Sequence, residues 1–122
     1  MDTQELKYRT KNFALRIIKL VQALPKTDIG RVIGNQLLRS GTAVGANYRS
    51  ACRARSTLEF IAKIGIVIEE SDESCFWLEM IIESNLMKPV LVQFLLKEAN
   101  EITAIMYSTR SSVIKRNSLK KS

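Results

Sequence analysis

The sequence lacks histidine and is poor in the residues that interrupt helices. Its 122 residues include no His, two Pro, five Gly and two Cys. The absence of histidine excludes a Ser–His or Cys–His nucleophile and any zinc site with a histidine ligand. The scarcity of proline and glycine argues against an all-β chain with many tight turns.

Long hydrophobic runs are also missing. The longest apolar stretch is Ile64 to Ile68, far below the ~20 residues that cross a bilayer. The first twenty residues carry scattered charges and no uninterrupted apolar segment of the kind found in secretory signals. Cys52 and Cys75 lack metal-type spacing and are expected to be buried thiols. We therefore expect a cytoplasmic protein with no membrane, cofactor, metal or small-molecule substrate.

Charge is distributed unevenly along the chain, whose net charge is +7. Residues 1–56 hold eleven Lys or Arg and three Asp or Glu, whereas residues 57–107 hold three and nine. Residues 108–122 hold five basic residues and no acidic one. A basic, then acidic, then basic chain indicates either contact with nucleic acid or pairing between its own segments.

Apolar residues recur every three or four positions in four segments, the spacing of one helix face. The segments cover about residues 4–24, 27–55, 56–87 and 89 onward, and no strand-like alternation competes with them. We predict an all-α, up-down-up-down, left-handed four-helix bundle in residues 1–114. Residues 115–122 are predicted to form a basic, disordered tail.

Cap residues mark where these helices begin. Thr27 is a candidate N-cap, and Ser56 with Glu59 forms a capping box. Pro89 suits the first turn of the last helix. Seven residues form the predicted core stripe of the second helix: Ile29, Ile33, Leu37, Ser40, Val44, Asn47 and Ala51. Buried Asn47 is predicted to fix helix register or bond a neighbouring helix.

Two further faces suggest close packing or assembly. Gly34, Gly41 and Gly45 form a line beside the core stripe of the second helix, typical of a kink or of a groove that receives another helix within or between subunits. On the third helix, Phe76, Trp77 and Met80 lie apart from the core stripe. A second apolar face predicts an interface, and hence a homo-oligomer.

An acidic run, Glu69 to Ser74, shares that face of the third helix. Glu73 lies beside the apolar residues and needs a partner there. The second helix offers arginines or the Asn47 amide. A paired-carboxylate catalytic or metal site is the alternative, but no other helix repeats a matching ligand set.

Basic residues form a face opposite the core stripe of the second helix. This face comprises Arg31, Arg39, Arg49 and Arg53, with Arg55 following at its end. The C-terminal segment adds further cations: Arg110, Lys115, Arg116, Lys120 and Lys121. Such a face either binds phosphates or pairs with the acidic third helix of the same or a neighbouring chain.

Two stretches carry a family resemblance. The segments QLLRSGTAVGANYRSA and RSTLEFIAKIG are similar to the bacterial four-helix-bundle family of ribosomal-RNA intervening-sequence proteins, over about residues 8–107. Matching without gaps places seven residues on the family pattern: Arg39, Ser40, Asn47, Ser56, Glu59, Phe60 and Glu73. The sequence departs from that pattern at five positions: Ser50, Ala51, Glu69, Glu70 and Cys75. The resemblance implies a ring-shaped homopentamer without catalytic residues.

These observations favour a non-enzymatic oligomer that binds RNA or DNA through the arginine face and the basic tail. The alternative is a protein–protein scaffold in which the arginines pair with acidic residues across subunits. An enzyme is the least favoured interpretation, because only the carboxylate cluster supports it.

Overall fold

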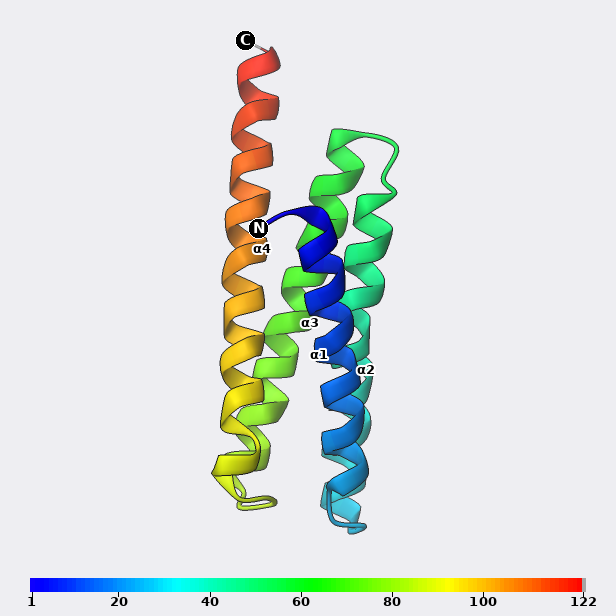
Figure 1. Ribbon diagram of the computed structural model, residues 1–122, viewed down its shortest axis with the longest axis vertical. Helices are drawn as coiled ribbons and strands as arrows, with labels where there is room; N and C mark the ends of the chain where they lie inside the picture. The colour runs from blue at the N-terminus through cyan, green and yellow to red at the C-terminus, as the bar shows by residue number, and fades with distance from the viewer. Residues whose placement is uncertain (122) are drawn as a thin grey trace.

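The computed structural model describes residues 1–121 as four antiparallel α-helices (Figure 1). The helices are α1 (Thr3–Ala23), α2 (Asp28–Cys52), α3 (Thr57–Glu83) and α4 (Gln93–Lys121), with a single 3₁₀ turn, η1 (Pro89–Leu91), before α4. No strand occurs in this part of the chain. The predicted all-α, up-down-up-down arrangement is confirmed, and Ser122 lies outside the described residues.

The predicted helix starts are confirmed by their caps. The Thr27 hydroxyl accepts a hydrogen bond from the Gly30 amide at 3.1 Å, and the Ser56 hydroxyl accepts one from the Glu59 amide at 3.1 Å. The Glu59 carboxylate accepts in turn from the amide of Arg55, at 3.1 Å. These side chains satisfy amides that the first helical turn leaves unpaired.

The end of α3 differs from the prediction, because the helix stops at Glu83. Asn85 adopts a left-handed backbone with φ 57°, and the Leu86 amide bonds the Ile81 carbonyl at 3.1 Å. This is a Schellman ending, in which asparagine is one of the few residues to tolerate positive φ. Asn85 therefore closes the helix, and α3 ends before the position predicted from the sequence. Pro89 begins η1 and not α4.

The core lies along α3, which packs between α2 and α4. Its Ser74 hydroxyl bonds Ser40 of α2 at 3.1 Å, whereas its Ser71 hydroxyl accepts from Thr103 of α4 at 2.8 Å. The large side chains that are fully buried in the core include Phe13, Ile17, Leu37, Ile64, Leu78, Ile102 and Met106. Val67 and Ile81 share the side of Ser74 and are fully buried, so α3 is buried against α2 as well as against α4.

A charged cluster joins α1 to α4 beside the apolar core. Arg9 donates to both oxygens of Glu98, at 2.8 and 2.6 Å, and to Glu101 at 2.6 Å. The hydrogen bond with Arg9 is the main reason that the pKa of Glu98 lies below its ordinary value. A half-buried bidentate pair of this kind fixes the position of α1 on α4.

The chain from residue 115 to 121 continues α4 and is not the disordered tail predicted for it. This end of α4 extends beyond α1 and beyond the α2–α3 connection (Figure 1). The N-terminus of α1, the C-terminus of α2 and the N-terminus of α3 therefore lie at the end of the bundle from which α4 projects.

Candidate nucleic-acid interface

The arginines predicted to form one face of α2 are spread along the length of the helix. Arg31 lies near the start of α2, where it pairs with Asp28 at 3.1 Å and donates to the Lys26 carbonyl at 2.9 Å. Arg53 follows 22 residues later, about 33 Å along the helix axis. One short phosphate segment cannot span both positions, so Arg31 belongs to a different end of the molecule.

Arg39, in the middle of α2, is paired with α3 of the same chain. Its guanidinium donates to Glu70 at 3.0 Å and also to Glu73. The hydrogen bond with Glu73 is the largest cause of its raised pKa. The acidic run was predicted to need a partner from the second helix. Arg39 of the same subunit is that partner.

Glu73 joins this ion pair to the aromatic residues of α3. The Trp77 indole N–H donates to the Glu73 carboxylate at 3.1 Å, and the Trp77 ring meets Phe76 edge-on at a centroid distance of 4.9 Å. Burial acts to raise the pKa of Glu73, but the hydrogen bonds from Trp77 and Arg39 outweigh it and the pKa is lowered. Glu73 is thus an ionised, structurally engaged carboxylate, whereas Glu69 and Asp72 are exposed.

Arg49, in the last turn of α2, and Arg53, the residue that follows the helix, line a groove with α1. The groove has a volume of about 490 Å³. Its other cations are Lys7 and Lys11, and none of the described residues that line it is acidic. None of these four side chains takes part in an ion pair within the described residues. Four uncompensated cations in one concave surface create a strongly positive site.

Glycine and other small residues bring the two walls of this groove together. A Cβ atom on Gly45 would lie 3.2 Å from the Thr10 carbonyl oxygen, so the α1 and α2 backbones approach closely there. Gly41 faces Ile17 of α1, and Gly34 faces Val21 of α1 and Leu24 at its end. Of the predicted alternatives, the structure therefore supports a glycine line that receives a helix of the same chain.

A second hollow, of about 430 Å³, adjoins the first on the α3 side. It shares Arg49 and Arg53 and adds Arg55 and Lys63. Lys63 is partly neutralised, because its amine lies 3.5 Å from the Glu59 carboxylate and donates to Ser50 at 2.6 Å. Positive charge therefore continues from the α1–α2 groove around the end of the bundle.

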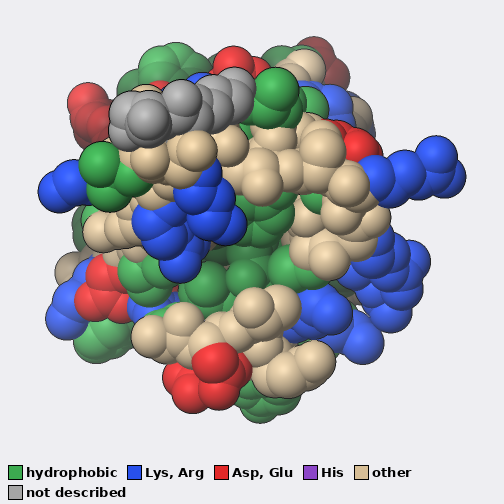
Figure 2. Space-filling view, turned by 90° about the horizontal axis from the view of Figure 1, so that it is seen from above, with side chains coloured by type: hydrophobic (Ala, Val, Ile, Leu, Met, Phe, Trp, Pro, Cys, Tyr) green, Lys and Arg blue, Asp and Glu red, His purple; other side chains and the backbone are tan. Residues whose placement is uncertain are grey.

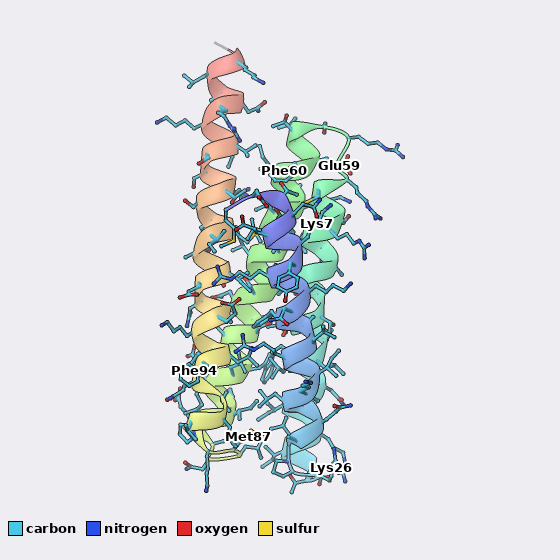
Figure 3. The ribbon with its side chains drawn as sticks, in the orientation of Figure 1. Lys7, Lys26, Glu59, Phe60, Met87 and Phe94 are labelled. Carbon is cyan, nitrogen blue, oxygen red and sulfur yellow. The ribbon has the colours of Figure 1, made fainter. Side chains whose placement is uncertain are left out.

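The C-terminal cations lie at the same end of the molecule. Arg116 and Lys120 line a shallow depression of about 180 Å³ together with Thr57 of α3. Lys115 is exposed on the same helix, and the side chain of Lys121 lies outside what the structure describes. Figure 2 shows Lys and Arg side chains projecting on several sides of this end, around a hollow in which hydrophobic side chains are visible. Figure 3 shows Lys7, Glu59 and Phe60 toward this end of the bundle and Lys26 at the opposite end.

Two residues that were predicted to belong to the α2 core stripe lie outside the core. Asn47 is half-buried and donates to the Ala43 carbonyl of its own helix at 2.8 Å, and not to another helix within the described part of the chain. Tyr48 is buried in its stead, and burial raises the pKa of Tyr48 to about 12. Ile29 is 63% exposed. The actual stripe is rotated toward Gly30, Gly34 and Gly41, because the absent side chains let α1 cover that side.

The sequence-based prediction missed the two lysines and the tyrosine of α1. Lys7 and Lys11 stand four residues apart and Tyr8 follows Lys7, so all three lie on one side of α1. Their spacing was visible in the sequence. Their proximity to Arg49 and Arg53 was not, because it depends on which helix packs against the glycine line.

The molecule is an all-α bundle that is basic at the end where α4 terminates. Comparisons with known proteins agree with the all-α fold. The chain belongs to the 23S rRNA-intervening sequence protein family, whose model matches residues 3–108. A search of curated proteins finds no match.

A solved structure is similar along almost its whole length. It is a protein of unknown function from the S23 ribosomal protein family of Bacteroides thetaiotaomicron. Its TM-score is 0.84 and its sequence identity 32%, over 91% of this chain and 99% of that one. The resemblance inferred from the two sequence segments is thus confirmed.

No helix in the described residues is long and apolar enough to cross a membrane. Nor does this part of the chain contain a group of three or more His, Cys, Asp or Glu residues placed to hold a metal ion.

Proposed function

We propose that this protein is a non-enzymatic RNA- or DNA-binding protein whose α1–α2 groove holds a phosphate backbone. The observation that carries the proposal is the set of four unpaired cations, from two helices, in one groove without an acidic residue. Cations that neutralise phosphates release condensed counterions, and this release supplies most sequence-independent affinity.

The geometry of the groove suits a linear polyanion. Lys7 and Lys11 on one wall, and Arg49 and Arg53 on the other, are each four residues apart, a rise of about 6 Å along each helix. The two walls therefore present two rows of positive charge to one strand. Arginine can also bind a phosphate through two parallel hydrogen bonds.

Charge reversal on the arginine wall tests the proposal. The double variant Arg49→Glu/Arg53→Glu should bind a fluorescent oligonucleotide at least about tenfold more weakly, because two attractive charges become repulsive. The matched control is Lys19→Glu/Lys97→Glu, which makes the same charge change at exposed positions outside the groove. Binding is measured by anisotropy after nuclease treatment and a high-salt wash. Equal binding by the groove variant and the wild type would refute the proposal, provided that circular dichroism shows both folded.

We further propose that the chain assembles as a homo-oligomer through α3, with the ring-shaped pentamer implied by the family resemblance as the expected form. Phe76 is 50% exposed, and Trp77 and Met80 are half-buried beside it. Exposed aromatic and apolar residues gathered in this way are typical of subunit interfaces. An oligomer would present several copies of the basic groove and raise its avidity for a long nucleic acid.

Assembly is tested by the solution mass from light scattering. Phe76→Glu should lower the mass, whereas Phe94→Glu, at another exposed phenylalanine on α4, should leave it unchanged. A monomeric wild type would contradict the assembly proposal without affecting the groove. The scaffold alternative assumed that the arginines pair with acidic residues of another subunit. Arg39 does not support that assumption, because it pairs with Glu70 and Glu73 within its own chain.

A further inference from the structure

Tyr8 is an exposed aromatic residue in the wall of the basic groove. Its side chain is 73% exposed, and it lines the groove together with Lys7, Lys11, Arg49 and Arg53. The ring contacts no other aromatic ring in the described residues, where the single ring pair is Phe76–Trp77. A tyrosine left this accessible among unpaired cations offers a flat apolar surface to a charged ligand.

The floor of the groove leaves that surface free. It is made of small residues, including Ala14, Thr42, Gly45 and Ala46. Because the backbones of α1 and α2 approach closely at Gly45, no large side chain rises between the two rows of cations. A ligand in the trough can therefore touch Tyr8 and the cations together.

This combination discriminates between forms of nucleic acid. A duplex offers phosphates to the four cations, but its base faces are hidden in the stack and unavailable to Tyr8. A single strand offers both phosphates and unstacked base faces. Charged grooves with aromatic platforms are the general solution for binding single strands.

We propose that the α1–α2 groove selects single-stranded segments, with one base stacked on Tyr8 while flanking phosphates contact Lys7, Lys11, Arg49 and Arg53. This inference rests on the proposed function, since it names the form of nucleic acid that the same groove takes. Phosphate contacts hold the strand in place, and the stacked base provides the preference over duplex.

The experiment compares a fluorescein-labelled single strand of roughly 12 nucleotides, within the site sizes known for single strands, with its blunt duplex at one salt concentration. The single strand should bind more tightly. Tyr8→Ala should weaken single-strand binding by about 5- to 150-fold, the range measured for loss of one stacked base. Its salt dependence should not change, because stacking releases no counterion. Tyr8→Phe should retain most of the affinity, because the ring face is kept.

Tyr107→Ala is the matched control, since Tyr107 is an exposed tyrosine on α4 that does not line the groove. Substitution of exposed Tyr8 by alanine should leave the fold intact, because alanine favours helix more than tyrosine does. Binding by Tyr8→Ala equal to wild type, or equal affinity for duplex and single strand, would overturn the inference. If that binding still required Arg49 and Arg53, the proposed function would stand. If the wild type bound neither probe, both proposals would fail.

Discussion

Replacing Gly41 by alanine tests the close packing of α1 on α2 that shapes the groove. A Cβ atom at Gly41 would lie 2.8 Å from two side-chain carbons of Ile17 and 3.2 Å from its Cβ. Ile17 is fully buried and β-branched, so its side chain has little freedom to move away. The added methyl group must therefore push α1 outward or strain Ile17.

Two opposing effects set the size of the change. Alanine gains about 1 kcal/mol over glycine in a helix interior. Overpacking a filled core costs about 1–3 kcal/mol, and contacts below 3 Å with an immobile side chain place Gly41→Ala at the upper end of that range. We expect a net loss of about 1–2 kcal/mol in the free energy of unfolding. With an unfolding entropy of about 2.1 cal/mol/K per residue, the thermal midpoint of this 122-residue chain should fall by about 4 °C per kcal/mol.

Thermal unfolding followed by circular dichroism at one protein concentration measures this loss. Gly65→Ala is the matched control, because its added Cβ would meet only Arg110 at an ordinary 3.6 Å. The control should gain stability from helix propensity alone, by up to about 1 kcal/mol. If Gly41→Ala were as stable as Gly65→Ala, α1 would not pack on the glycine line as described.

Three further outcomes follow from named contacts. Glu98→Gln should lower the free energy of unfolding by about 1–2 kcal/mol by weakening the pairing with Arg9, as measured by chemical denaturation. Because the pKa of folded Glu98 is lowered, its contribution is complete above the ordinary carboxyl value of about 4.3 and is lost as pH falls through the folded value. The gap between wild type and variant should therefore close in acid, and a gap that widened would contradict the pairing. Ser74→Ala should cost about 1 kcal/mol, because it removes the buried hydroxyl bond between α2 and α3; an unchanged denaturation midpoint would count against that bond. Burial raises the pKa of Cys75 to about 11, so a maleimide at pH 8 should label half-buried Cys52 first, and rapid labelling of native Cys75 would contradict its burial.

The sequence was enough to predict four helices and their order, because local signals decide both. The hydroxyl caps of Thr27 and Ser56 and the repeated apolar spacing act within a few residues. The end of α3 was predicted too late, because Asn85 accepts the left-handed conformation that closes the helix. A helical wheel treats such a residue as one more helix position.

The candidate site was predicted only in part, since its composition depends on contacts between distant residues. Arg39 finds Glu70 and Glu73 more than thirty positions away, and this pairing removes it from the free cations. The glycine line was recognised, but its partner was not. Once α1 occupies that line, Lys7 and Lys11 join Arg49 and Arg53, and the charge concentrates at one end of the bundle.

The most direct test of the central claim is the salt dependence of oligonucleotide binding. Each neutralised phosphate contributes about −0.7 to the slope of log K against log salt for a single strand, so the four groove cations should give a slope of about −3 or steeper. Lys7→Ala/Lys11→Ala should make that slope shallower by about 1.4. A wild-type slope near zero, or a double variant with the wild-type slope, would show that the α1–α2 groove does not hold the phosphate backbone.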